Sequence, residues 1–438
     1  MSHISRAPER PPAKSPLDER YYDERDLEGE LKRTFQICHE CRMCVNYCGS
    51  FPELFARVDR DIESGRAEGA EAITYDDIKV VSDQCWQCKL CFIKCPYTED
   101  DDAYELLDFP RLMAREKAAR AQRDGVAMVD RILGEPQAVG ASGSGRLASL
   151  SNLVTRSQLL RKVQEKTIGI SAEFPLPPFA EETFPAWNER RRKDPEAGRA
   201  GQVVLFATCY GNYNTPEVPK AATKVLEFLG YDVVTVNETC CGMPSLDGGD
   251  VAGAQDKIRY NVARLIGPVR AGAKVLVPAS TCGYTMKKEW LEYVDDPEVA
   301  EVVAATLDLM EFIEQLRRAK ALPAATKPLG KVTYHAACHL RAQKVGFPAA
   351  RVLAKALPKT EVRIVQECSA VDGTWGMKAE HYEAGRKYAQ RLVEAVDEDE
   401  ADFVLTDCGL SALRIQKENG CEVHHPIEVL LEAYGLSR

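Results

Sequence analysis

The sequence CHECRMCVNYC occupies residues 38–48, and CWQCKLCFIKCP repeats its cysteine spacing at residues 85–96. In each run three cysteines are evenly spaced, so their thiols can wrap around one inorganic centre, while the fourth lies too far along the chain to complete that set. This is the ligand pattern of two [4Fe-4S] clusters. Structural zinc, the main alternative, usually takes two C-x-x-C pairs separated by a longer loop and does not need a third evenly spaced cysteine.

The fourth cysteine of each run is expected to cross to the neighbouring cluster. The predicted ligands are Cys38, Cys41, Cys44 and Cys95 for cluster 1, and Cys85, Cys88, Cys91 and Cys48 for cluster 2. A disulfide framework is not expected, because the chain opens MSHISRAPER without an apolar signal segment and its cysteines are tightly grouped. These features predict a reducing, cytoplasmic compartment.

Composition narrows the function classes. The 438 residues carry 57 Lys and Arg against 67 Asp and Glu, and the net charge of −10 argues against a nucleic-acid partner. The chain is long enough, and at 45% hydrophobic residues apolar enough, for several domain cores. No run of about twenty apolar residues exists, so no transmembrane segment is predicted. Membrane contact would then need a peripheral helix or a partner subunit.

We predict a multidomain α+β protein. Residues 1–30 mix prolines with charges of both signs, a composition typical of a mobile tail. Residues 31–123 hold both cysteine runs and are expected to form a mostly helical, two-[4Fe-4S] ferredoxin-type domain. Residues 124–200 are predicted to be a linker with some helix, followed by two α/β modules at residues 201–325 and 326–438.

One linker segment has helical periodicity. Five apolar residues fall roughly on one face of this helix, and they are Leu150, Leu153, Val154, Leu160 and Val163. Basic residues stand among the polar positions, which allows an interfacial helix at a membrane. The interpretation that we favour is a helix whose apolar face packs against its own protein.

The second half of the chain repeats itself. GQVVLFATCYGNY at residues 201–213 is similar to GKVTYHAACHLRA at residues 330–342. Cysteines follow three predicted strands in each copy. They are Cys209, Cys240, Cys241 and Cys282 in the first copy, and Cys338, Cys368 and Cys408 in the second. Because ligands bind at the carboxyl ends of strands in open α/β sheets, we expect these cysteines to mark binding sites.

The two copies differ in the number of thiols that they offer. Four cysteines in the first copy can hold a further iron-sulfur cluster. In the second copy Ser369 stands where the paired cysteine would be, so that site is incomplete and would need an oxygen or nitrogen ligand, such as Asp372 or His339, or an open iron. Cys421 fits neither repeat and is predicted to be structural.

The sequences TCCGMP at residues 239–244 and ECSAVDGTWGMK at residues 367–378 resemble the two CCG-type modules of heterodisulfide-reductase-related proteins. With the two N-terminal cysteine runs, the architecture is similar to the iron-sulfur subunits of anaerobic glycerol-3-phosphate dehydrogenase and glycolate oxidase, and to the D subunit of heterodisulfide reductase. The resemblance covers residues 31–123 and 201–430. Thr285 and Ser411 replace cysteines of the fullest CCG modules, so five-thiolate clusters are not expected.

The resemblance implies a non-catalytic electron-transfer subunit, which relays single electrons between a flavoprotein dehydrogenase and a quinone or other acceptor. A quinone pool or a membrane subunit would lie downstream. No strand runs into G-x-G-x-x-G, so a separate subunit is expected to hold the flavin. A heterodisulfide-reductase-like enzyme, with its catalytic iron-sulfur site in the CCG modules, is the alternative. A redox-sensing regulator lacks specific support, since the basic run at residues 190–193 is typical of a solvated face. We expect a cytoplasmic protein, peripheral at the inner membrane face through a partner or an interfacial helix.

Overall fold

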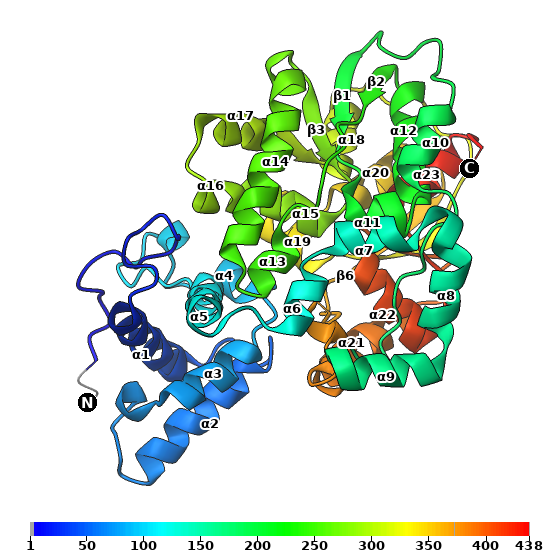
Figure 1. The fold of residues 1–438 in the computed structure, drawn as a ribbon. Helices are drawn as coiled ribbons and strands as arrows, with labels where there is room; N and C mark the ends of the chain where they lie inside the picture. Colours follow the sequence, from blue (N-terminus) through cyan, green and yellow to red (C-terminus); the bar gives the residue numbers. More distant parts are fainter. Residues whose placement is uncertain (1–3, 372, 438) are drawn as a thin grey trace.

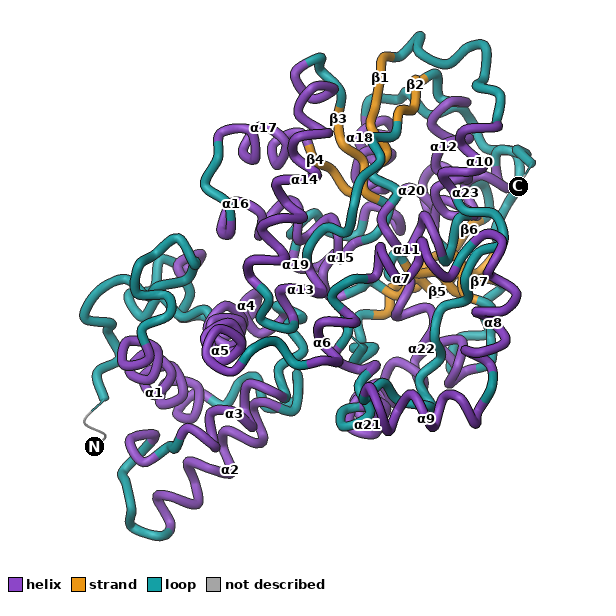
Figure 2. Tube along the Cα trace, viewed as in Figure 1, coloured by secondary structure: helices purple, strands orange, loops and turns teal. Residues whose placement is uncertain are grey.

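The computed structural model describes residues 4–371 and 373–437. A helical N-terminal region lies to one side of two α/β modules, and the connecting segment runs along the outside of those modules (Figure 1). Figure 2 shows that the strands form two groups, both outside the N-terminal region. No helix of the described residues combines the length and the apolar character needed to cross a bilayer.

The N-terminal region is entirely helical in its regular structure. Its elements are α1 (Glu24–Cys41), α2 (Ser50–Glu63), η1 (Ala70–Ala72), α3 (Tyr75–Asp83), α4 (Leu90–Lys94), η2 (Glu99–Asp101) and α5 (Phe109–Asp124). Asp23 caps α1, and a capping box of Thr74 and Asp77 starts α3. The rings of Phe51 and Phe109 lie 4.7 Å apart at the centre of the helices. The predicted helical character of this region is therefore confirmed.

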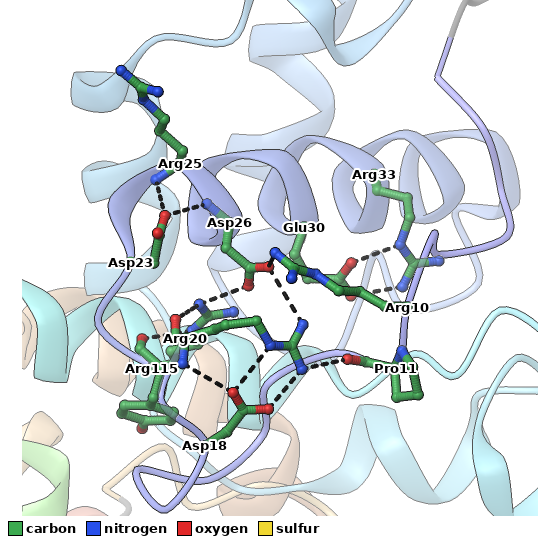
Figure 3. A network of polar contacts seen from close by, with 11 residues as sticks. Arg10, Pro11, Asp18, Arg20, Asp23, Arg25, Asp26, Glu30, Arg33 and Arg115 are labelled. Atoms are coloured by element: carbon green, nitrogen blue, oxygen red, sulfur yellow. Dashed lines mark hydrogen bonds and ion pairs between the residues drawn. The ribbon is translucent and has the colours of Figure 1, made fainter.

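The segment predicted as a tail packs against other parts of the chain in its described part. Tyr21 is only 1% exposed, and α1 starts within the segment, so residue 30 is not a structural boundary. The buried guanidinium of Arg115 on α5 donates hydrogen bonds to the carbonyl oxygens of Tyr21 (2.7 Å) and Arg20 (2.6 Å), and it pairs with Asp26 at 2.9 Å (Figure 3). Composition could not reveal this anchor, because the buried partner is almost a hundred residues away.

The linker contains several helices and is held against the modules. Its elements are α6 (Met128–Leu133), α7 (Pro136–Gly143), η3 (Gly145–Leu147), α8 (Ala148–Arg156), α9 (Gln158–Ile168) and α10 (Phe184–Arg190). Ile170 forms an isolated bridge with Lys378, and Lys378 pairs with Asp130 at 2.6 Å. The segment therefore wraps the second module rather than crossing open solvent.

The apolar face predicted in the linker points to solvent. The five predicted residues, Leu150, Leu153, Val154, Leu160 and Val163, are all at least 43% exposed. The buried side of α9 instead carries Arg161, which donates to the carbonyl oxygens of Ser171 and, at 2.7 Å, Phe174. Our favoured interpretation, a face packed on its own protein, is wrong, because a polar residue anchors α9 and turns its leucines outward.

The two modules have the same sheet topology, which confirms the repeat. The strands are β1 (Gly201–Leu205), β2 (Tyr231–Val234), β3 (Lys274–Val277) and β4 (Thr306–Asp308), then β5 (Gly330–His335), β6 (Thr360–Val365), β7 (Phe403–Thr406) and β8 (Val423–His424). The strand orders are β2-β1-β3-β4 and β6-β5-β7-β8, and every pair is parallel. All strands of a sheet consequently end at the same edge.

Helices cover both sheets. In the first module they are α11 (Thr208–Tyr213), α12 (Glu217–Phe228), α13 (Met243–Asp247), α14 (Val251–Arg270), α15 (Ser280–Tyr284), the π-helical turn η4 (Thr285–Glu289), α16 (Trp290–Tyr293), α17 (Pro297–Ala305) and α18 (Leu309–Arg318). In the second they are α19 (Cys338–Ala342), α20 (Pro348–Ala356), η5 (Trp375–Met377), α21 (Tyr382–Asp397), α22 (Gly409–Asn419) and α23 (Pro426–Ala433).

The modules share one hydrophobic core, in which Leu205 and Leu309 of the first pack with Tyr334 and Leu405 of the second. Helix α12 packs against α23, and α18 against α20. At the strand ends, the backbone N–H of Ser280 donates to the carbonyl oxygen of Asp407 at 3.1 Å. The carboxyl edges of the two sheets therefore meet at the module interface.

Two carboxyl groups are buried at this interface. Asp308 ends β4 and caps α18, and Asp407 follows β7 and accepts a 2.7 Å hydrogen bond from the Tyr334 hydroxyl. Burial, reinforced by the negative charge of Asp407, raises the pKa of Asp308 to about 8, and burial raises the pKa of Asp407 to about 6. At neutral pH the pair therefore retains a proton that the unfolded chain would release.

The variant Asp308→Asn should remove one source of pH-dependent stability while retaining the helix cap. The folded pKa lies above the ordinary value, so the stabilisation is complete below pH 3.8 and is lost as pH rises toward about 8. Across this window the unfolding free energy of the wild type should fall, relative to that of the variant, by up to about 1.4 kcal/mol per pH unit. Denaturant unfolding at several pH values measures both slopes.

The control is Asp296→Asn, which changes the exposed cap of α17 and should retain the wild-type pH dependence. Equal slopes for the wild type and Asp308→Asn would contradict the buried, protonated pair.

Candidate functional site

The two N-terminal cysteine runs come together in crossed groups. Burial raises the pKa of the Cys38 thiol most, and the next largest increases come from the neighbouring thiols of Cys95, Cys44 and Cys41. The last cysteine of the second run therefore lies with the first run. For Cys91 the corresponding thiols are those of Cys88, Cys48 and Cys85, which places the last cysteine of the first run with the second. The structure thus groups the eight cysteines as the ligand sets predicted from their spacing.

The backbone turns sharply between these cysteines. Cys38 and Cys41 lie in the last turn of α1, which ends at Arg42 in the left-handed conformation. Gln87 and Lys89, which flank Cys88, also have positive φ angles of 55° and 62°. Such residues are uncommon outside sharply folded or functional loops. The turns bring thiols that are three residues apart toward a common centre.

The surroundings of Cys48, Cys85, Cys88 and Cys91 are compatible with an iron-sulfur group. A small cavity lies among Cys48, Cys85, Cys88 and Cys91, with aromatic walls that include Phe51. Burial raises the pKa of the Cys48 thiol, so deprotonation of this group requires a neighbouring cation. Four cysteines and the aromatic side chains beside them form much of this lining, and thiolate sulfur is the ligand that an iron-sulfur cluster needs.

The first module gathers its four cysteines into one row, in which Cys209, Cys240 and Cys241 are buried and Cys282 is partly exposed. Cys209, Cys240, Cys241 and Cys282 follow β1, β2 and β3. These thiols lie close enough to shift one another's pKa: Cys209 and Cys241 lower the pKa of Cys240, and Cys240 and Cys282 raise the pKa of Cys241. The predicted convergence of these residues at the sheet edge is therefore observed.

Backbone constraints hold this row in place. Gly242 has φ 99° directly after the cysteine pair, a conformation that glycine adopts without strain. Thr208 has φ 71° directly before Cys209, which is unusual for a β-branched residue. The Trp290 indole N–H donates to the Cys241 carbonyl oxygen at 2.9 Å, and the Asn261 amide donates to the Cys240 carbonyl oxygen at 3.0 Å.

The second module keeps three cysteines in different surroundings. Cys338 and Cys368 pack beside the core of the N-terminal region, whereas Cys408 lines a cavity together with cysteines of the first module. Ser369 and Ser411, the two positions at which the resemblance leads one to expect cysteines, have hydroxyl oxygens that are hydrogen-bonded to each other at 2.9 Å. The two serines are therefore neighbours in the structure, although 42 positions separate them in the sequence.

Two residues, Asp372 and His339, were predicted as substitute ligands for the second module. Asp372 lies outside the described residues. His339 is buried, and burial lowers its pKa to about 4, so the ring is neutral. Its Nδ1 atom is 3.1 Å from the Thr281 hydroxyl oxygen and its Nε2 atom is 3.2 Å from the Gln87 carbonyl oxygen. Both ring nitrogens are engaged in polar contacts within the protein, so this helical histidine does not have the surroundings of a metal ligand. Cys421 packs against the apolar cluster around Ile415, as expected of a structural cysteine.

His339 joins three parts of the site. It directly follows Cys338, it contacts the residue before Cys282, and it contacts the residue between Cys85 and Cys88. Its ring stacks on Tyr284 with centroids 5.0 Å apart. The sequence signal for this role was only the position of a histidine beside a strand-end cysteine.

A buried ion pair lies next to this bridge. Lys89 pairs with Glu289 at 2.9 Å, and Lys89 also donates to the Gln87 side-chain oxygen at 2.8 Å. The Gln87 amide in turn donates to the Cys85 sulfur at 3.4 Å. The lysine therefore places a positive charge beside Cys85 and Cys88. The sequence does not reveal this pair, because its partners are about 200 positions apart.

A cavity of about 610 Å³ opens beside the cysteine row of the first module. Cys209, Cys240, Cys241 and Cys282 form part of its wall. Most other lining residues are apolar and come from the linker, among them Val139, Leu150, Val154, Leu176 and Phe179. The segment predicted to be a linker thus encloses the space next to the candidate site.

Comparisons with known proteins agree with this arrangement. The CCG cysteine-rich domain family matches residues 203–287 and 332–416. The C subunit of anaerobic glycerol-3-phosphate dehydrogenase from Escherichia coli is 29% identical over 299 residues, which cover 67% of this chain and 74% of the relative. The glycolate oxidase iron-sulfur subunit of Escherichia coli is 22% identical over 416 residues, 92% of this chain and 95% of the relative.

A shorter relative covers about half of the chain. Lactate utilization protein A of Bacillus licheniformis is 27% identical over 242 residues, which cover 52% of this chain and 98% of that protein. The chain thus contains two copies of the CCG cysteine-rich domain and is homologous to the C subunit of anaerobic glycerol-3-phosphate dehydrogenase and to the glycolate oxidase iron-sulfur subunit.

Proposed function

We propose that this chain is a cytoplasmic iron-sulfur subunit that passes single electrons from a partner flavoprotein dehydrogenase to a quinone. The observation that carries the proposal is the buried connection between the cysteine sites, in which His339 contacts both Gln87 and Thr281. The relatives are subunits of a dehydrogenase and of an oxidase, which supports a separate partner for substrate oxidation. Bound [4Fe-4S] clusters would supply one-electron redox chemistry.

The chain's own residues would hold the clusters and set their surroundings. Cys38, Cys41, Cys44 and Cys95 would bind cluster 1, and Cys85, Cys88, Cys91 and Cys48 would bind cluster 2. Buried Lys89 favours a more negative charge on the sulfur groups beside it, and the Gln87 amide hydrogen bond to Cys85 acts in the same direction. Glu289 compensates the lysine charge, so the buried pair costs less than an isolated cation.

The first CCG copy is proposed to hold a third iron-sulfur centre on Cys209, Cys240, Cys241 and Cys282. The contacts between these thiols support this assignment, and so does the cavity beside them. The second copy is proposed to lack a complete site. Ser369 and Ser411 occupy cysteine positions and satisfy each other by a hydrogen bond, which lowers the support for disulfide-cleaving chemistry there.

The crossed ligand sets predict which variants lose the same signal. The two N-terminal clusters would contain about eight irons in the wild type. Cys95→Ser and Cys44→Ser should each lose the EPR signal of cluster 1 and about four of these irons. Cys91→Ser should lose the other signal. Iron and sulfide analysis with EPR on anaerobically purified protein makes the measurement.

Cys421→Ser is the matched control and should retain every signal. If Cys95→Ser instead lost the signal that Cys91→Ser loses, the crossed assignment would be wrong.

The third centre predicts more than about eight irons in the wild type. Cys241→Ser should lower the iron content and abolish one EPR signal during a reductive titration, without changing the two N-terminal signals. The control is Ser369→Ala, which changes the corresponding position of the second module. Equal iron content and equal spectra in the wild type and Cys241→Ser would contradict the third centre and indicate a protein with two clusters.

The direction of electron flow predicts how the reduced protein reacts. Anaerobically reduced protein should be reoxidised by a water-soluble quinone analogue and only slowly by a small disulfide. Stopped-flow absorbance of the iron-sulfur chromophore follows both reactions. Faster reoxidation by the disulfide would favour the heterodisulfide-reductase-like alternative over the electron-relay function.

A further inference from the structure

Helices α8 and α9, with the turn η3 before them, expose a set of apolar side chains that no part of the described chain covers. We call this set the α8–α9 face, and its members are Leu147, Leu150, Leu153, Val154, Leu159, Leu160 and Val163. Each is between 43% and 74% exposed. Single exposed apolar residues are ordinary, but a grouped set marks an interaction surface.

Polar anchors on the opposite side determine this orientation. The Asn152 side chain exchanges two hydrogen bonds with the backbone of Phe179, at 2.9 and 2.8 Å. Arg161, only 3% exposed, donates to the Phe174 and Ser171 carbonyl oxygens. The helices are therefore attached to the protein through polar groups and direct their leucines away from it. In Figure 1 they lie at the edge of the molecule away from α1 and α2.

The charge around the face favours an anionic lipid surface as the occupant. Arg146, Arg156, Lys162 and Lys166 are exposed on the same segment, in a chain whose net charge is −10. Glu165 is the only acidic residue between positions 145 and 168, and its carboxylate accepts a hydrogen bond from the Ala172 N–H at 2.6 Å. Leucines flanked by lysine and arginine are the composition of helices that lie in the plane of a membrane interface.

The face is continuous with the cavity beside the cysteine row. Leu150 and Val154 belong to the face and also line the cavity that reaches Cys241 and Cys282. Val139 of α7 is 42% exposed and also lines it. An apolar molecule dissolved in a bilayer could therefore pass from the face into the cavity without crossing bulk water.

We propose that the α8–α9 face docks on an anionic lipid bilayer and that the apolar electron acceptor enters the cavity from this side. The docking surface stands on exposure and charge alone, whereas the identity of the entering molecule rests on the function proposed above.

Flotation with vesicles of phosphatidylcholine and phosphatidylglycerol tests the docking on the full chain with its iron intact. The wild type should float with these vesicles, and less at high salt. Leu153→Gln with Leu159→Gln changes two exposed leucines that do not line the cavity. The partition coefficient should fall by at least about tenfold, since each leucine loses the transfer of its side chain out of water.

Leu291→Gln, on α16, changes a leucine that is 42% exposed and should float like the wild type. Absence of flotation by the wild type, or equal flotation of the double variant, would overturn the docking proposal. Capture of the partner flavoprotein that depends on Leu153 and Leu159, without vesicle binding, would assign the face to a protein and overturn it as well.

Reoxidation of the reduced protein by a water-soluble quinone separates the two proposals. The double variant should react like the wild type with this acceptor, but at least about tenfold more slowly than the wild type with a long-chain quinone embedded in vesicles. If the protein binds vesicles but reacts with neither quinone, acceptor entry and the electron-relay function are overturned. The docking proposal then stands. Reaction with the soluble quinone without flotation would overturn the docking and the entry of the acceptor from a bilayer, and would leave the electron-relay function.

Discussion

The parallel direction of all strands is the constraint on which the CCG half depends. In a parallel sheet every strand ends at the same edge, so residues that follow different strands become neighbours. Cys209, Cys241 and Cys282 are separated by tens of residues in the sequence, yet they form one row at the edge of the first sheet. The second sheet has the same strand order, and the shared core brings its edge against that of the first.

Buried polar contacts determine how the helical region sits on these modules. Lys89 with Glu289, His339 with Gln87, and Trp375 with the Asp83 carbonyl oxygen all join the N-terminal region to the α/β half. A buried ion pair adds little net stability, but the loss of one partner is costly, so such pairs specify one arrangement among many apolar alternatives. For an electron relay this specificity matters, because the distances between redox sites must remain constant.

The linker combines two roles that the order of the chain does not suggest. Its inner surface closes the cavity beside the first-module cysteines through Phe179 and Val139, and its outer surface presents the leucines of α8 and α9. Asn152 and Arg161 make this possible, because their hydrogen bonds to the 171–179 segment attach the helices without using the apolar side. A segment whose composition predicts a simple connection thus forms one wall of the candidate site.

The sequence by itself determined the crossed grouping of the N-terminal cysteines, the helical character of the N-terminal region, the repeated α/β topology and the convergence of the strand-end cysteines of the first module. These features follow from local spacing and from the rule that parallel strands end together. Only the tertiary structure decided that the segment around Tyr21 is anchored by Arg115, that the leucines of α8 and α9 face outward, and that Ser369 is hydrogen-bonded to Ser411. Each of these features depends on partners that are far apart in the chain. Periodicity also indicates only that a helix has an apolar face, and it does not indicate which surface, if any, covers that face.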